Sequence, residues 1–316
     1  MKEQAYYSFY NPVRFKYLHK DFLEMKNVKF SGNEIIKKTA TFIGEDRNVY
    51  IDTSDGVNED LEIQEYCGRI KKVINHSNGK PFVFLKSAYS QKWSKNITDE
   101  ASKNNGTVLP FFKWSFNDNF YSKIYNRRES VIEKYYSPEK EYDIGIFFEE
   151  KDYLYPKPSS FDALISHSDH KAFGIEGFSE DTGYYANNSR QNLIKKLKDS
   201  DFKILHTSMP YEDYIKSSFN CKIIINPPGI GEYTSRMVDQ TYLGNCIVMR
   251  KNSYDNAHSW KNYIPEVDFN SENWEKDLKN IIDNYEAHQL KCKEYFDKFW
   301  TSKSICEYLK KIINES

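Results

Sequence analysis

The chain has 316 residues, 39% of them hydrophobic and 16% aromatic, a length that suits two α/β domains of about 150 residues each. A net charge of −1 excludes a global field that recruits nucleic acid, and no stretch approaches the ~20 apolar residues of a membrane span. The five cysteines lack metal-ligand or CxxC spacing, and no apolar secretory run precedes Pro12, so we expect a reducing, cytoplasmic setting without disulfides or structural zinc.

In the first half of the chain, short apolar runs alternate with amphipathic segments, which is typical of β–α–β units. Strands are predicted at 41–43, 49–52, 82–85 and 108–112. Residues 61–75 predict a helix, because Leu61, Tyr66, Ile70 and Val73 share one face. The polar stretch 135–142, YYSPEKEY, predicts a linker.

The second half repeats this alternation after an irregular segment at 149–188. Strands are predicted at 142–148, 202–205, 221–226 and 246–250, and helices at 189–200, at 211–218 and up to about Gly244. Ser271 predicts the cap of a long helix, and Thr301-Ser302 separates that helix from the last one. The chain is therefore predicted to form α/β domains at 1–138 and 139–300, followed by a C-terminal helix at 301–316.

The segment from Cys221 to Arg250 carries the strongest chemical signal. A strand leads into the turn PPGIGE, where Gly229 and Gly231 allow a ligand to approach the backbone closely. A helix then begins near Ser235, and its free N–H groups favour a diphosphate. Arg236 in the first helical turn adds a bidentate phosphate contact. The alternative is an ordinary strand–turn–helix whose glycines serve the turn alone.

Glu232, Ser235, Arg236 and Asp239, followed by GNCIVM at 244–249, resemble the donor-binding motif of GT-B-fold glycosyltransferases, most closely the CgeB-like and exostosin-like subgroup. The resemblance implies two Rossmann-like domains facing across a cleft, a last helix crossing back to the first domain, and a nucleotide-sugar donor in the C-terminal half. It implies that Asp239 contacts the ribose, where Glu is commoner, while the loop and Arg236 face the diphosphate and the sugar. The donor-binding candidates are Gly229, Gly231, Glu232, Tyr233, Thr234, Ser235, Arg236 and Asp239.

Other candidates follow strands or begin helices. Asp52 and Asp55 lie in the VYIDTSDG turn, where a carboxylate would act as the general base that an inverting transfer needs; the alternative is a local Asx turn. Lys113 would steady the leaving phosphate, or lie on the surface. Arg190 would take a phosphate role in place of the basic residue that this family often has after its first donor-domain strand, or be a solvated arginine at a helix start.

His167 and His170 have HxxH spacing, but no third ligand fits them, so we predict that donor binding needs neither a metal nor another cofactor. The predicted activity is a hexosyl or pentosyl transfer from a nucleotide sugar to a hydroxyl of a saccharide or glycoconjugate. One alternative is transfer to hydroxymethylated bases of phage DNA, with phosphates held by basic residues at 71–72, 80, 127–128 and 195–196. The other is a non-catalytic protein that binds a nucleotide or glycan on a degenerate transferase fold.

Overall fold

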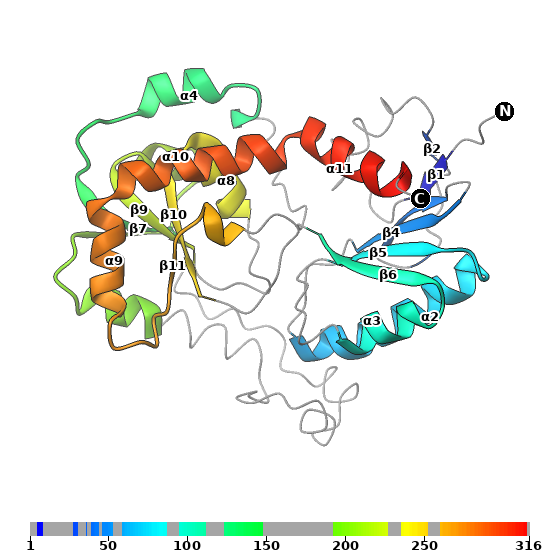
Figure 1. Ribbon diagram of the computed structural model, residues 1–316. Coiled ribbons are helices and arrows are strands. Elements are labelled where there is room, and N and C mark those ends of the chain that lie inside the picture. The colour runs from blue at the N-terminus through cyan, green and yellow to red at the C-terminus, as the bar shows by residue number, and fades with distance from the viewer. Residues whose placement is uncertain are drawn as a thin grey trace. The chain divides into compact units, whose positions relative to one another are not determined.

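The computed structural model describes residues 5–8, 28–30, 36, 39–43, 46–52, 59–86, 95–111, 123–147, 192–226, 235–251 and 260–314. The chain divides into two compact units (Figure 1). Unit 1 consists of Met1–Phe116, Ser253–Trp260 and Asp297–Ser316, and unit 2 consists of Asn117–Asn252 and Lys261–Phe296. Each unit is built around its own β-sheet.

Unit 1 contains a six-stranded mixed sheet with the order β2-β1-β3-β4-β5-β6. Its strands are β1 (Ala5–Ser8), β2 (Val28–Phe30), β3 (Thr39–Ile43), β4 (Asn48–Asp52), β5 (Phe82–Lys86) and β6 (Gly106–Pro110). Strands β4, β5 and β6 run parallel, while β3 is antiparallel to both of its neighbours. Helices α2 (Glu59–Ser77) and α3 (Lys95–Ser102) make the two crossovers between the parallel strands.

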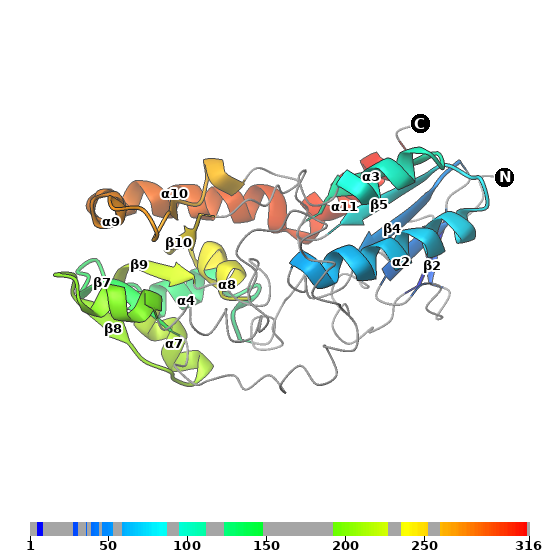
Figure 2. The same cartoon turned by 90° about the horizontal axis from the view of Figure 1, so that it is seen from below.

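Helices α2 and α3 cover one face of the unit 1 sheet, and α11 (Ser302–Asn314) lies on the other (Figures 1 and 2). The Tyr308 ring on α11 stacks on Phe111 with centroids 6.2 Å apart. Arg47, between β3 and β4, donates a hydrogen bond from Nη1 to the Ile312 carbonyl at 3.5 Å. The C-terminal helix therefore packs on the first sheet, as the sequence predicts.

Unit 2 contains a fully parallel five-stranded sheet with the order β11-β10-β9-β7-β8. Its strands are β7 (Tyr142–Ile146), β8 (Ile204–His206), β9 (Cys221–Asn226), β10 (Cys246–Arg250) and β11 (Glu266–Val267). From β7 the chain proceeds to β8 on one side, and then returns past β7 to β9 and β10 on the other. Neighbouring strands β7 and β9 therefore send their connections in opposite directions.

The connecting helices of unit 2 lie on both faces of its sheet (Figure 1). The helical stretch 192–198 and α9 (Trp274–Asp283) bury Leu193 and Leu278 against Ile223 and Ile225. On the other side lie α7 (Tyr211–Ser218), α8 (Ser235–Leu243) and α10 (Tyr285–Tyr295) (Figure 1). Both units are thus Rossmann-like α/β folds, which confirms the predicted fold class.

The first unit ends earlier along the chain than the boundary predicted after residue 138. Helix α4 (Arg128–Tyr135) overlaps the segment predicted as a linker, and it belongs to unit 2. Arg128 donates from Nε to the Tyr242 carbonyl, and its guanidinium lies 4.4 Å from the centroid of the Tyr242 ring. This anchor joins positions 114 apart in sequence, so no local pattern reveals it.

Gly244 ends α8 with a positive φ of 74°, as a Schellman cap requires. The Gly244 and Asn245 amides donate to the carbonyls of Thr241 and Gln240, respectively. The long helix predicted from Ser271 is instead two helices, α9 and α10. Asn284 separates them, and its side-chain amide donates back to the Asn280 carbonyl at 2.8 Å, a local bond that competes with helix continuation.

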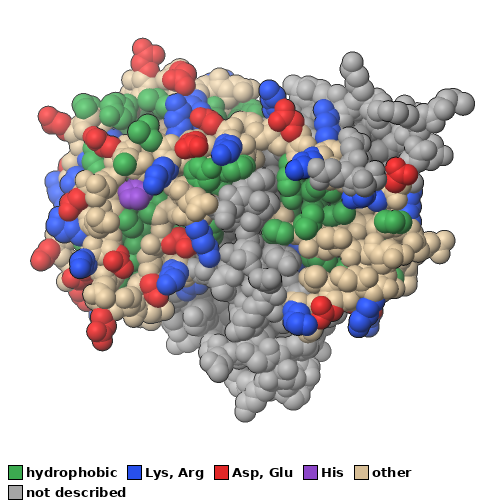
Figure 3. All heavy atoms as spheres, viewed as in Figure 1, with side chains coloured by type: hydrophobic (Ala, Val, Ile, Leu, Met, Phe, Trp, Pro, Cys, Tyr) green, Lys and Arg blue, Asp and Glu red, His purple; other side chains and the backbone are tan. Residues whose placement is uncertain are grey.

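A five-residue π-helical segment, η4 (Phe296–Trp300), follows α10, and a 3₁₀ turn, η3 (Trp260–Asn262), precedes β11. Within the described part of the chain, no helix is long and apolar enough to cross a membrane. On the face drawn in Figure 3, Lys and Arg side chains are interspersed with Asp and Glu over the described surface. This distribution agrees with the near-zero net charge.

Candidate functional site

The carboxyl ends of β7 and β9 form a topological switch point in unit 2. In open α/β sheets, ligands bind outside the carboxyl ends of strands where neighbouring connections diverge. Strand β9 is fully apolar at its centre, because Ile223, Ile224 and Ile225 face helices on both sides of the sheet. The strand ends at Asn226, and the chain re-enters the described structure at the first turn of α8.

Several predicted site residues lie outside the described residues. These are Gly229, Gly231, Glu232, Tyr233 and Thr234 in the β9–α8 connection, together with Arg190, Lys113 and Asp55. Their roles remain predictions. Ser235 is the first residue of α8, and Arg236 follows it in the first helical turn. Arg236 and Asp239 are therefore the donor-binding candidates whose side chains the structure describes.

Arg236 connects the start of α8 to the end of β7. Its Nη2 donates a hydrogen bond to the Phe147 carbonyl at 2.9 Å, across 89 positions of sequence. Phe147 follows the last residue of β7 and is 7% exposed. This bond places the guanidinium at the switch point between β7 and β9. The arginine side chain is partly buried there, which restricts its conformations.

Asp239 lies three residues beyond Arg236 on α8 and is only 2% exposed. Burial raises the pKa of its carboxyl to about 8, against smaller opposing effects of the Tyr211 hydroxyl and the Arg236 charge. The carboxyl is consequently protonated at neutral pH. The ribose contact that the resemblance implies for Asp239 stays a prediction; among the described residues, its carboxyl lies beside the Tyr211 hydroxyl of α7.

Helix α7 encloses Asp239 with two tyrosines. The rings of Tyr211 and Tyr214 pack edge to face with centroids 5.8 Å apart, and Tyr214 makes a similar contact with Phe147 at 5.3 Å. Burial, followed by the nearby Asp239 charge, raises the pKa of each tyrosine hydroxyl. Phe147 thus meets Arg236 through its carbonyl and α7 through its ring.

A chain of buried polar groups fixes α7 against α8. Gln240 donates from Nε2 to the Tyr214 hydroxyl at 2.5 Å and accepts at Oε1 from Asn245 Nδ2 at 2.6 Å. The same Asn245 amide also donates to Ser218 Oγ at 3.1 Å, at the end of α7. Buried hydrogen bonds of this kind rigidify a core because breaking one leaves a polar atom without water. The elements around Arg236 are therefore held in one arrangement.

Two further basic side chains lie at the carboxyl ends of β8 and β10, the strands that flank β7 and β9. His206 is the last residue of β8, and Arg250 is the last residue of β10. Both are partly buried. Sequence reasoning missed them, although the rule that ligands meet the carboxyl ends of parallel strands would have selected both. It also missed Phe147, because a backbone carbonyl leaves no compositional signal.

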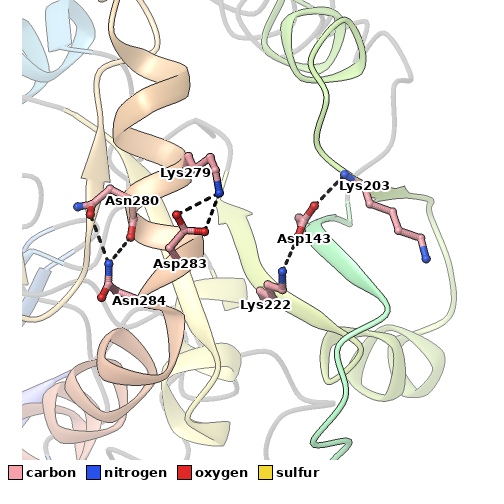
Figure 4. A network of polar contacts seen from close by, with 7 residues as sticks. All are labelled: Asp143, Lys203, Lys222, Lys279, Asn280, Asp283 and Asn284. Carbon is pink, nitrogen blue, oxygen red and sulfur yellow. Dashed lines mark hydrogen bonds and ion pairs between the residues drawn. The ribbon is translucent and has the colours of Figure 1, made fainter.

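The opposite, amino-terminal end of the unit 2 sheet holds an unrelated polar network (Figure 4). Asp143 on β7 accepts from Lys222 Nζ at 2.7 Å and from the Lys203 backbone amide at 3.0 Å. Burial works to raise the pKa of Asp143, but the two hydrogen bonds and the positive charges of Lys222 and Lys279 outweigh it and hold that pKa below its usual range. This network ties β9 and β8 to β7 and lies far along the strands from the switch point.

In unit 1, Asp52 ends β4 and is engaged by an arginine. Arg69 Nη1 on α2 lies 2.6 Å from Asp52 Oδ1, and the side chains are 4% and 0% exposed, respectively. A general base must reach a substrate proton. The enclosed ion pair gives Asp52 a structural role between β4 and α2, and leaves Asp55 as the candidate base from this turn.

Among the described residues, no three His, Cys, Asp or Glu side chains gather as metal ligands. His167 and His170 lie outside the described residues. The basic residues considered for DNA contact differ in their surroundings. Lys71, Lys72, Lys195 and Lys196 are exposed, and Lys196 also donates from Nζ to the Phe269 carbonyl at 2.6 Å. Arg128 is partly buried and packs on Tyr242.

No family model matches the chain. No curated protein matches it either. Among solved structures, it is similar to a sucrose-phosphate synthase from Thermosynechococcus elongatus, with a TM-score of 0.42 and 8% identity over 85% of this chain and 68% of that chain. A likeness this distant carries no argument about activity, so the function is argued from the motif and the switch point.

Proposed function

We propose that unit 2 binds the diphosphate of a nucleotide sugar at the carboxyl ends of β7 and β9, and that the protein is a glycosyltransferase. The observation that carries this proposal is the position of Arg236. It lies in the first turn of α8, after the glycine-bearing connection from β9, and bonds to the carbonyl that follows β7. Guanidinium groups bind phosphate oxygens bidentately, and the amide groups of a helix start add partial positive charge.

In the proposed reaction, the hydroxyl of a saccharide or glycoconjugate displaces the nucleoside diphosphate from the anomeric carbon of a hexosyl or pentosyl donor. Negative charge develops on the departing diphosphate, where Arg236 and the α8 amides would stabilise it without a metal ion. A base must remove the proton of the acceptor hydroxyl. Asp55 remains our candidate for this role because Asp52 is enclosed with Arg69.

The donor proposal is tested by titrating UDP, GDP, ADP and their sugar conjugates into the full chain by calorimetry, with thermal shift as a screen. Arg236→Ala should weaken binding by about 1.5–3 kcal/mol, roughly 10- to 150-fold in Kd. The matched control is Arg127→Ala, because Arg127 is also an arginine at a helix start in unit 2 but is exposed. Equal affinity of the wild type and the Arg236 variant would remove Arg236 from the donor site.

A second candidate is a nucleotide-binding protein without transfer activity. The buried Asp52–Arg69 ion pair favours this candidate, since it engages one of the two carboxylates that were expected to act as the base. Release of nucleoside diphosphate from a bound nucleotide sugar separates the candidates. We expect slow donor hydrolysis in the wild type and a marked loss in Asp55→Asn, with donor affinity unchanged. Binding without any release would favour the second candidate.

A further inference from the structure

The buried carboxyl of Asp239 is a feature that the motif resemblance does not explain. The side chain is 2% exposed and lies beside the Tyr211 hydroxyl of α7. Its Oδ1 accepts no hydrogen bond from the described residues. An isolated buried carboxylate is costly, and a neutral carboxyl is the form that such surroundings favour.

Asp239 lies on the same helix as Arg236, about one turn further along. Residues with this separation project from neighbouring positions of one helix face. The Arg236 charge favours ionisation of the acid, although burial opposes ionisation more strongly. An ionised Asp239 would therefore attract the guanidinium toward α7 and compete with any bound phosphate.

Contacts between residues connect Arg236 to α7, which lies beside Asp239. Arg236 bonds to the Phe147 carbonyl, the Phe147 ring packs on Tyr214, and Tyr214 packs on Tyr211. The Tyr211 hydroxyl in turn acts on the Asp239 carboxyl and lowers its pKa. We propose that Asp239 is a positioning residue for the diphosphate site: its neutral form leaves Arg236 directed at the phosphate, and its ionised form weakens nucleotide binding. This inference rests on the proposed function of the same site.

Between pH 7 and 9, the charged and titratable groups around Asp239 keep their protonation states, so a change in nucleotide binding would come from Asp239 itself. Arg236 from α8 stays charged throughout this range. Tyr211 and Tyr214 from α7 stay neutral, because burial and the adjacent acid raise the pKa of both hydroxyls. The nucleotide cannot cause weaker binding at high pH, since its terminal phosphate loses its last proton at a pKa near ~6.

The test measures the Kd of UDP, GDP and ADP at pH 7, 8 and 9 for the wild type and Asp239→Asn. Wild-type affinity should fall on the order of tenfold across this range. Asparagine reproduces the neutral acid in shape, so the Asp239→Asn variant should bind as the wild type does at pH 7 and keep that affinity at pH 9. Any pH dependence that persists in this variant comes from other groups.

Tyr211→Phe provides a second, directional test. The Tyr211 hydroxyl lowers the pKa of Asp239, so its removal should move the midpoint of the affinity loss to higher pH. The proposal also has a readout without nucleotide. A raised folded-state pKa means that the folded protein holds a proton that the unfolded chain has lost, so wild-type melting temperature should fall as pH rises from 5 to 8. Asp239→Asn should reduce that slope.

Three results would overturn the positioning role. A large loss of affinity in Asp239→Asn at pH 7 would show that the nucleotide needs the carboxyl oxygens themselves. Wild-type binding that is independent of pH would show that Asp239 does not act on Arg236. If Tyr211→Phe left the midpoint pH of the affinity loss unchanged, the ionisation of Asp239 would not be what weakens nucleotide binding. If none of the three nucleotides binds at any pH, the proposed function itself fails. If Asp239→Asn still changed how the melting temperature depends on pH, Asp239 would then have a structural role only.

Discussion

Each unit places an arginine and an aspartate near the carboxyl end of a central parallel strand, but the two pairs are organised differently. In unit 1, Arg69 and Asp52 come from different elements and meet at 2.6 Å in a nearly solvent-free ion pair. In unit 2, Arg236 and Asp239 share one helix, and the guanidinium donates to a backbone carbonyl. The acid beside it is held in its neutral form by burial.

The same two residue types thus form a buried ion pair in one unit, whereas in the other the guanidinium bonds to a carbonyl beside a neutral acid. A direct, buried ion pair joins two elements and becomes costly to break. A guanidinium bonded to a carbonyl, beside an acid that is neutral at pH 7, retains more of its positive field for an incoming anion. The comparison therefore predicts large stability effects in unit 1 and mainly binding effects at the switch point of unit 2.

The largest expected effect comes from breaking the unit 1 pair. Asp52→Ala leaves Arg69 buried without that carboxylate, so the free energy of unfolding should fall by about 3–5 kcal/mol. Urea unfolding followed by hydrogen exchange in residues 39–52 and 59–77 would locate the loss. The control is Asp99→Ala, which removes the exposed pair with Lys95 and should cost no more than about 0.5 kcal/mol. A loss below the control would contradict a structural role for Asp52.

The next effect concerns the packing that supports Arg236. A Cβ added at Gly145 would lie 2.6 Å from the Phe147 ring and 2.9 Å from Cys221 Sγ. Gly145→Ala should therefore destabilise unit 2 by about 1–3 kcal/mol and weaken nucleotide binding, because Phe147 must shift. Gly68→Ala is the control, since nothing lies within 4 Å of its added Cβ on α2.

We expect Gly68→Ala to stabilise unit 1 by about 0.5–1 kcal/mol, because alanine restricts the unfolded chain. If Gly145→Ala lowered stability yet left nucleotide affinity intact, the Phe147 carbonyl would not be needed to place Arg236. Calorimetric titration of the same nucleotides provides that measurement.

A smaller effect tests whether the two ends of the unit 2 sheet act independently. Lys222→Ala removes the partly exposed ion pair with Asp143 and should cost about 1 kcal/mol or less, with nucleotide affinity unchanged. The folded-state pKa of Asp143 is lowered, so its contribution is present above the unfolded pKa and is lost as pH falls through the folded one. Acid unfolding curves of Lys222→Ala should show a smaller loss of stability than those of the wild type in that pH window.

The smallest effect concerns His76, in the last turn of α2 in unit 1. His76 Nδ1 lies 2.7 Å from the Tyr50 hydroxyl, and burial lowers the pKa of the imidazole. The unfolded chain therefore binds a proton more readily, and the stability of unit 1 should decline as pH falls below the unfolded pKa of about 6.5. His76→Asn should flatten this decline in urea titrations at pH 7.5, 6.5 and 5.5. An unchanged slope would assign the decline to another group.

The sequence predicted best where burial on both faces leaves a continuous apolar strand. Strands 221–226 and 246–250 and helix 211–218 match the observed elements. Their connections follow from the alternation of strand and helix patterns. It predicted poorly where long-range contacts decide the structure, as in the docking of α4 through Arg128 and the short strands β1 and β2.

The candidate site divides in the same way. Local spacing was enough to select Arg236, because a helix start after a glycine-bearing turn is a local pattern. The burial of Asp239 depends on where α7 packs, and the partner of Arg236 is a carbonyl 89 positions away. Both follow from tertiary structure, which a motif does not contain. The enclosure of Asp52 by Arg69 has the same origin.

The packing of α11 in unit 1 has a consequence for how the chain matures. Tyr308 bonds to the Pro110 carbonyl at 3.5 Å across 198 positions, and Ile312 accepts from Arg47 across 265. The ribosome synthesises the strands of the unit 1 sheet before α11, so the sheet cannot complete this packing until α11 has been made. Until residues 302–314 emerge from the exit tunnel, α11 cannot cover its face of the unit 1 sheet, and nascent chains paused before that point should be more exposed to chaperones and proteases.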